Sequence, residues 1–159
     1  VYTIGHSTRS LAELARLLKQ YGVVQVVDVR RFPTSRKNPQ FRREVLEEYL
    51  RQRGFEYLWL GKELGGYRPG GFKEYVKTQE FSKAIDELCA LLEEKPTVIM
   101  CSEKLWFRCH RRFISDELVR RGYEVIHIVE RDRAYRHKIR ERRKSANQEI
   151  HRWLAQQPP

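Results

Sequence analysis

The sequence predicts one α/β domain of three layers, in which helices cover both faces of a mostly parallel sheet of about five strands. Short apolar runs alternate with helical patterns along the chain, which is typical of β-α-β units. The run at residues 23–29 is almost entirely β-branched and apolar, which indicates a strand covered on both faces. With 159 residues, the chain can bury a core without metals or disulfides.

Local signals mark where the predicted elements begin and end. A capping-box pattern at Ser10 opens the first helix, Asn38 caps the second with Pro39 in its first turn, and Gly54 ends it. Pro96 stops the third helix. We predict strands at residues 1–4, 23–29, 55–60, 97–100 and 123–129 and helices at residues 11–21, 39–53, 81–94 and 107–121.

Residues 61–71 contain five glycines and one proline, a composition that predicts a loop. Long loops in compact domains are often functional. Tyr67 and Arg68 therefore either cover a site, with Tyr67 stacking on a nucleobase, or belong to a surface loop whose glycines serve only turns.

The character of the chain changes after residue 130, so we divide it into an α/β domain at 1–130 and a basic C-terminal helical extension at 131–159. The extension holds nine Lys and Arg against three acidic residues. Its basic face is either simply solvated or a surface for nucleic acid. The opposite face carries a weak helical stripe predicted to pack on the domain, formed by Tyr135, Ile139, Ile150, Trp153 and Leu154.

Charge and cysteine content narrow the class of protein. A net charge of +11 favours anionic partners, either a phosphorylated small molecule or nucleic acid, although a generally basic soluble protein has the same balance. Apolar runs of at most five residues predict no membrane span. Three cysteines argue against a disulfide framework, and no signal-peptide pattern is visible, so we expect a cytoplasmic protein.

Three polar motifs follow directly on apolar runs. If these runs are parallel strands, the motifs meet at the carboxyl edge of one sheet, where ligands bind in open α/β folds. The motifs are Gly5-His6-Ser7 after the first predicted strand, Asp28-Val29-Arg30 at the end of the second, and Cys101-Ser102-Glu103-Lys104 after the fourth.

The segment after Cys101 combines thiols with cations. Cys109 falls near a predicted helix start, where free amides and the nearby Arg108 and Arg111 favour anions and a thiolate. Three interpretations of the cysteines stay open. They are buried apolar groups, or Cys101 or Cys109 is a nucleophile or a redox-sensitive thiol, or Cys101, Cys109 and His110, with or without His6, bind a metal. Standard zinc spacing is absent, so we expect no metal and no cofactor. Cysteine loops of phosphatases and rhodaneses carry Arg about six residues after Cys, where this chain has Phe107, so their chemistry is not predicted.

His6 and Asp28 are the other titratable groups at this edge. The ordinary pKa of histidine suits His6 to proton transfer. A carboxylate at the end of a buried strand needs a partner, so Asp28 either orients His6 or Arg30 for chemistry or forms a purely structural ion pair. Glu103 is a second carboxylate near the same edge.

Four groups of residues, in order, resemble the DUF488 family. The resemblance spans about residues 1–128 and implies an α/β domain with these motifs in one pocket. It implies no reaction, since the name denotes a domain of unknown function, and it carries nothing onto the extension. The groups are Thr3-Ile4-Gly5-His6-Ser7, Asp28-Val29-Arg30 with Pro33 and Ser35, Leu60-Gly61 with Leu64-Gly65-Gly66, and Cys101-Ser102-Glu103 with Cys109-His110-Arg111.

Together these observations predict a pocket at the carboxyl edge for a phosphate-bearing substrate, either a nucleotide or a base in nucleic acid. Two non-catalytic alternatives stay open: a nucleic-acid-binding module that uses residues 131–159, and a nucleotide sensor. The candidate catalytic residues are His6, Asp28, Cys101, Glu103, Cys109 and His110. The candidate anion- and substrate-binding residues are Gly5, Ser7, Arg30, Ser35, Tyr67, Arg108 and Arg111.

Overall fold

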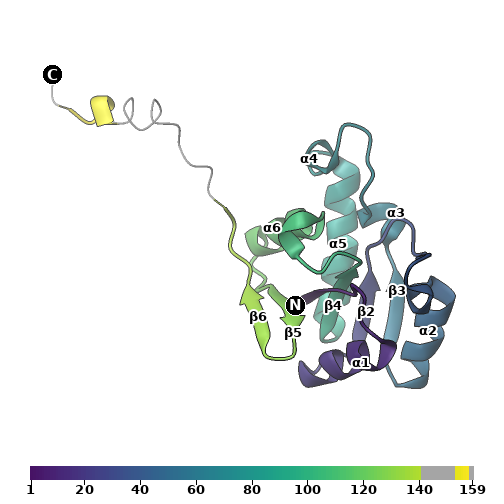
Figure 1. Ribbon diagram of the computed structural model, residues 1–159. Helices are drawn as coiled ribbons and strands as arrows, with labels where there is room; N and C mark the ends of the chain where they lie inside the picture. The colour runs from purple at the N-terminus through teal and green to yellow at the C-terminus, as the bar shows by residue number, and fades with distance from the viewer. Residues whose placement is uncertain (141–152, 158–159) are drawn as a thin grey trace.

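The computed structural model of the chain describes residues 1–140 and 153–157 and contains one six-stranded sheet (Figure 1). The strand order is β3-β2-β4-β1-β5-β6, with β6 antiparallel to β5 and every other pair parallel. The predicted mostly parallel sheet is confirmed. The strands are β1 (Tyr2–Gly5), β2 (Gln25–Asp28), β3 (Glu56–Trp59), β4 (Thr97–Cys101), β5 (Ile126–Glu130) and β6 (Arg133–Arg136).

Helices cover both faces of the sheet, so the three-layer prediction is also confirmed. Helices α1 and α2 pack on one face, and α5 and α6 pack on the other (Figure 1). The helices are α1 (Leu11–Gln20), α2 (Arg43–Gln52), α3 (Gly61–Leu64), α4 (Phe72–Tyr75), α5 (Gln79–Glu94) and α6 (Arg111–Arg120), with 3₁₀ turns at Pro39–Phe41 and Trp106–Arg108.

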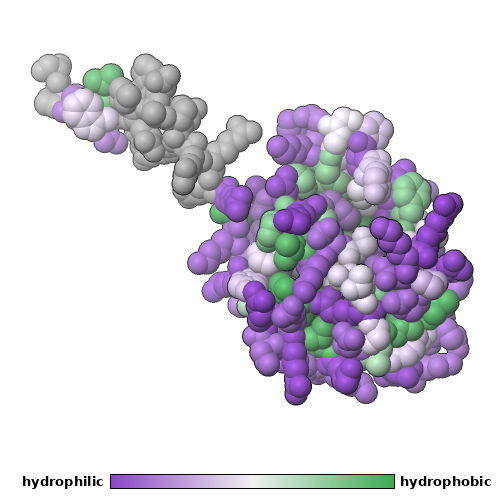
Figure 2. Space-filling view, in the orientation of Figure 1, coloured by the Kyte–Doolittle hydropathy of each residue, from purple (hydrophilic) through white to green (hydrophobic). Residues whose placement is uncertain are grey.

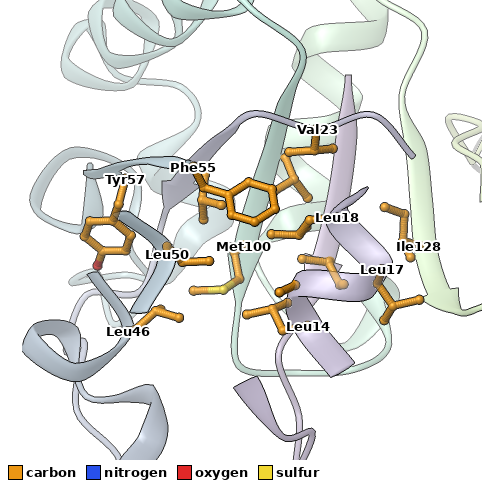
Figure 3. Close-up of a cluster of buried hydrophobic side chains, with 14 of the residues drawn as sticks. Leu14, Leu17, Leu18, Val23, Leu46, Leu50, Phe55, Tyr57, Met100 and Ile128 are labelled. Atoms are coloured by element: carbon orange, nitrogen blue, oxygen red, sulfur yellow. The ribbon is translucent and has the colours of Figure 1, made fainter. Parts of the chain in front are cut away.

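Alternation along the strands divides the core in two. On the α1–α2 side, Met100 of β4 packs with leucines of both helices, including Leu18 and Leu50 (Figure 3). The neighbouring Ile99 and Cys101 of β4 belong to the cluster on the α5–α6 side. Successive side chains of a strand point to opposite faces, so each polar residue at a strand end is committed to one side of the sheet.

The cap at Ser10 is confirmed, because its hydroxyl accepts a hydrogen bond from the Glu13 amide at 3.1 Å. The cap predicted at Asn38 is wrong. Its side chain makes no capping bond, the residues that follow form a 3₁₀ turn, and α2 begins only at Arg43. The predicted loop at 61–71 is wrong in its first part, because α3 occupies Gly61–Leu64.

The prediction of a helical extension is wrong at its start, because residues 133–136 form β6. These residues pair with β5, whose outer edge would otherwise leave its amides and carbonyls unpaired. Tyr135, assigned to a helical stripe, therefore lies in a strand. Residues 153–155 are helical, but Trp153 and Leu154 are exposed rather than packed on the domain, and Ile150 lies outside the described residues.

Hydrophilic residues predominate on the face of the molecule shown in Figure 2, with only small apolar areas between them. Across residues 1–140 and 153–157, none of the helices combines the length and the apolar character needed to cross a bilayer.

Candidate functional site

A cleft of about 700 Å³ opens at the carboxyl ends of β2 and β4, on the α5–α6 side of the sheet. It lies where the sequence predicts a site, because the loops after both strands line it. Its walls combine three kinds of side chain. They are the thiols of Cys101 and Cys109, the cations Arg30, Arg31, Arg108 and Arg112, and the aromatic rings of Phe32, Tyr67, Phe72, Phe107 and Phe113.

The two cysteines of the cleft are in direct contact. Their Sγ atoms lie 3.3 Å apart, and both thiols are free. Burial raises the pKa of Cys101, so this thiol keeps its proton and donates it toward Cys109. That hydrogen bond lowers the pKa of Cys109 to about 5; burial opposes the shift, and Arg111 adds to it. These contacts therefore favour the thiolate form of Cys109.

Arg111 is the cation nearest to this thiolate, and it is almost completely buried at 1% exposed. Its backbone amide and its Nε each donate to Cys109 Sγ at 3.4 Å. Its remaining donors reach Thr3 Oγ1 at 3.0 Å and the carbonyls of Glu103 and Lys104. Within the described residues no carboxylate pairs with Arg111, so the thiolate is its nearest counter-charge.

His110 follows Cys109 and has a fixed tautomer. Its Nε2 donates to the carbonyl of Val29 at 2.9 Å, so Nδ1 carries the free lone pair. This Nδ1 lies beside Gly66, another residue of the cleft wall. Burial lowers the pKa of His110, and the ring is neutral at neutral pH. His110 can therefore accept a proton within the cleft.

Asp28 is fully buried and satisfied by two partners. Arg30 donates to both carboxylate oxygens, with Nη2 at 2.7 Å from Oδ2 and Nε at 2.9 Å from Oδ1. The Tyr57 hydroxyl donates to Oδ2 at 2.5 Å. Burial and the adjacent carboxylate raise the pKa of Tyr57 far above its ordinary value. Arg30 also donates to the carbonyl of Phe41 at 2.7 Å, which ties the loop after β2 to the turn before α2.

His6 belongs to this ionic cluster and not to the cleft. Its ring stacks on Phe41 with the ring centres 4.0 Å apart. Nδ1 donates to the carbonyl of Ser7 at 2.9 Å, which leaves Nε2 to face Arg30 Nη1 at 3.4 Å. Burial lowers the pKa of His6 to about 4, and the ring is neutral at neutral pH.

The structure thus places some of the predicted site residues in the cleft and others outside it, and Arg30 lines the cleft while pairing with Asp28. The cleft is lined by Arg30, Tyr67, Cys101, Glu103, Arg108, Cys109 and His110. Outside the cleft lie Gly5, His6, Ser7, Asp28, Ser35 and Arg111. The expectation of one pocket holding all the motifs is therefore corrected. Asp28 and Cys101 end neighbouring strands but point to opposite faces.

Three of the residues outside the cleft have contacts of their own. Gly5 permits a close approach of backbone to backbone, because a Cβ there would lie 1.8 Å from the Glu103 carbonyl oxygen. The Ser35 hydroxyl accepts from the Asn38 amide at 3.0 Å, and so closes a turn. Ser7 lines a second, larger hollow between α1 and the end of β5.

The candidate list omits several residues that build these sites. Phe32 and Phe107 are exposed aromatic residues of the cleft, and their position in loops next to arginines was the available signal. Tyr57 stands in the third strand with no motif around it, so no local pattern indicates that it meets Asp28. Among the described residues, no group of three or more His, Cys, Asp or Glu is arranged to hold a metal ion.

Comparison with family models adds one finding. The model of the domain of unknown function DUF488 matches residues 10–118. The chain belongs to the DUF488 family. The DUF488 match includes Asp28, Arg30 and the segment from Cys101 to Arg111, whereas β1, β5 and β6 lie outside it. It is shorter at both ends than the span of about residues 1–128 expected from the motifs. Neither the curated proteins nor the solved structures give a match.

Proposed function

We propose that this DUF488 protein is an enzyme that acts on a phosphate-bearing substrate with a planar ring, a nucleotide or a nucleotide unit of nucleic acid. The observation that carries this proposal is the thiol of Cys109, held against the buried Arg111 at the cleft. A low thiol pKa beside a cation is typical of nucleophilic cysteines. Cys109 is the nucleophile in this proposal.

The arginines of the cleft support an anionic substrate. Arg31, Arg108 and Arg112 line it, and none of them forms an ion pair within the described part of the chain. Guanidinium groups bind phosphate in a bidentate manner. The aromatic residues support a planar ring, because Phe32 is 62% exposed and Tyr67 84% exposed, with ring centres 5.7 Å apart. Large apolar side chains left exposed at a cleft are typical of a binding surface.

The chemistry follows from the protonation states. The Cys109 thiolate attacks an electrophilic atom of the substrate, a bond to sulfur forms, and the leaving group departs with its electron pair. Water then breaks the bond to sulfur, and Nδ1 of His110 accepts the proton that this water loses. Cys101 and Arg111 stabilise the thiolate before attack and after release. His6, Asp28 and Arg30 are assigned to support of the loop after β2 and not to catalysis.

The test measures whether Cys109 is reactive and whether nucleotides cover it. Alkylation by iodoacetamide near pH 7, resolved by peptide mass spectrometry, is expected to modify Cys109 well before Cys89 of α5. Nucleoside phosphates are expected to slow this modification more than inorganic phosphate does. Equal rates at the two cysteines, or no protection by any nucleotide, would contradict the proposal.

Turnover separates an enzyme from a sensor. Product formation from a panel of nucleoside phosphates is expected to be lost in Cys109→Ser and retained in the matched variant Cys89→Ser. If nucleotides bind and protect Cys109 but none is converted, the chain is a nucleotide sensor and the catalytic part of the proposal is wrong.

A further inference from the structure

A chain of hydrogen bonds runs from Arg111, behind the cleft, to Asp116 on α6. Arg111 Nη1 lies 3.0 Å from Thr3 Oγ1, which lies 2.5 Å from His127 Nδ1. His127 Nε2 lies 2.8 Å from His137 Nδ1, and His137 Nε2 lies 2.6 Å from Asp116 Oδ1. The three middle residues are buried, and Asp116 is 25% exposed.

Donation can run in one consistent direction along this chain of hydrogen bonds, from Arg111 to Asp116. A guanidinium only donates, so the Thr3 oxygen accepts from Arg111, and in this direction the Thr3 hydroxyl donates to His127 Nδ1. His127 must then carry its proton on Nε2 and donate to His137, which donates from Nε2 to the carboxylate. The His127 ring is neutral in this arrangement. Burial lowers the pKa of His127 to about 2, which agrees with a neutral ring.

The chain joins two opposite charges that do not touch. Arg111 has no carboxylate partner among the described residues, and Asp116 makes its ion contact through His137. Trp106 links His127 to the cysteine segment. Its ring lies parallel to that of His127, with the ring centres 4.4 Å apart. Its carbonyl accepts a hydrogen bond from the Cys109 thiol when that thiol is protonated. The chain therefore contacts the cysteine segment at two points.

We propose that Thr3, His127, His137 and Asp116 form a positioning relay that holds the Arg111 guanidinium against the sulfur of Cys109. None of the four touches the cleft, so they are positioning residues and not catalytic ones. The relay rests on the proposed role of Cys109 for its significance, but its geometry is independent of the substrate. Three of its members lie outside residues 10–118, so β1, β5 and the residue after β6 complete the site that the family match contains only in part.

The test uses the pH dependence of Cys109 alkylation in the full chain, a readout that a merely structural role would not move. Thr3→Val removes the hydroxyl and keeps the volume, whereas Thr3→Ser keeps the hydroxyl. Thr3→Val is expected to raise the midpoint of the alkylation profile from about 5 by about one unit. Thr3→Ser is expected to retain the original midpoint.

A second variant at the far end keeps the test decisive if Thr3→Val fails to fold. Asp116→Asn is expected to raise the midpoint in the same direction, while Asp132→Asn, which removes an exposed carboxylate in the β5–β6 turn, leaves it unchanged. The direction of the shift in the midpoint distinguishes a loss of Arg111 positioning from the direct effect of the removed charge. Removing a negative charge would by itself favour the thiolate and lower the midpoint. A midpoint that stays or falls in Asp116→Asn would overturn the relay.

The two proposals fail separately. A raised midpoint in a protein that no nucleotide protects would support the relay and contradict the proposed function. An unchanged midpoint in a protein whose Cys109 is protected by nucleotides would contradict the relay and support the proposed function.

Discussion

At the residue scale, the carboxylate of Asp28 is fully buried and pairs with the buried guanidinium of Arg30. The loss of one partner from such a pair leaves a buried charge without compensation. Five hydrogen bonds reach the Asp28 side chain, from the Arg30 guanidinium, the Arg30 amide and the Tyr57 hydroxyl. Stability should therefore depend on these three groups to different degrees.

Two substitutions rank these contributions. Tyr57→Phe removes one donor from a carboxylate that Arg30 still satisfies, so we expect a loss of about 1–3 kcal/mol in the free energy of unfolding. Asp28→Asn leaves the guanidinium unpaired and should cost about 3–5 kcal/mol. Urea denaturation measures both, with Tyr49→Phe as a control whose hydroxyl makes no hydrogen bond in the described part of the chain. Equal losses in Tyr57→Phe and Tyr49→Phe would contradict this account.

His6 makes stability depend on pH in a defined window. Its folded-state pKa of about 4 lies below the ordinary value of 6.5, so between these values the unfolded chain binds a proton that the folded chain does not. Stability should therefore fall as pH decreases from 6.5 to about 4, by about 3 kcal/mol from this group.

Thermal unfolding across this pH window provides the measurement. The variant His6→Gln is expected to show a shallower decline than the parent protein, and a matching decline in both would assign the acid sensitivity to other groups, such as His127.

Most of these residues, but not their partners, can be located from the sequence. The strands that carry Asp28 and Cys101 are buried on both faces, so no alternation of exposed polar and buried apolar residues indicates which way either side chain points. Tyr57, His127 and His137 belong to no motif and meet their partners only through the order of the strands. This is why the ionic cluster and the cleft were predicted as one site.

At the scale of elements, the end of β1 and the loop after β4 form one unit. The amides of His6 and Ser7 donate to the carbonyls of Cys101 and Ser102 at 2.8 and 3.0 Å, which continues the pairing of the two strands past Gly5. Gly5 makes this contact possible because its hydrogen faces the Glu103 carbonyl. The position of the cysteines therefore depends on β1.

Gly5→Ala tests this dependence. The added methyl would lie 1.8 Å from a backbone oxygen, so we expect a loss of about 3 kcal/mol or more in stability and slower alkylation of Cys109. Gly66→Ala is the control, because its Cβ would meet only the His110 ring, at 3.5 Å. Unfolding curves and thiol reactivity measure the difference, and an unaffected Gly5→Ala protein would contradict the packing described.

Most elements could be predicted from local signals, and the failures occurred where tertiary contacts decide. The Ser10 cap and the helix periodicities are local and were sufficient. By contrast, β6 forms because β5 offers an edge, and α3 forms where Gly61 passes within contact of the Arg30 carbonyl. The arginine-rich composition of β6 does not indicate its pairing with β5, and the glycine-rich composition around α3 does not indicate its contact with Arg30.

At the scale of the whole molecule, a net charge of +11 should produce association with polyanions that does not depend on sequence. The basic residues of the cleft and those of the extension are separate sources of this charge. Residues 131–137 contribute β6 and His137 to the domain, so a chain ending at Lys138 keeps both.

A salt titration with single-stranded DNA and RNA distinguishes the two sources. We expect binding to weaken steeply with salt and to be largely lost in the chain ending at Lys138, while Cys109→Ser binds as the parent does. Binding that survives the truncation but not substitution of Arg108 and Arg112 would assign polyanion contact to the cleft instead.

The antiparallel strand at the margin of the sheet has a bearing on solubility. All four residues of β6 are exposed, and arginines stand at both of its ends. Bulky cations on a short outermost strand repel an incoming β-segment from another molecule, a device that discourages fibrous self-association. We expect the replacement of Arg133 and Arg136 by threonine to promote self-association through this edge of the sheet, while the cysteines stay unchanged. Turbidity measured as the protein is concentrated would detect it.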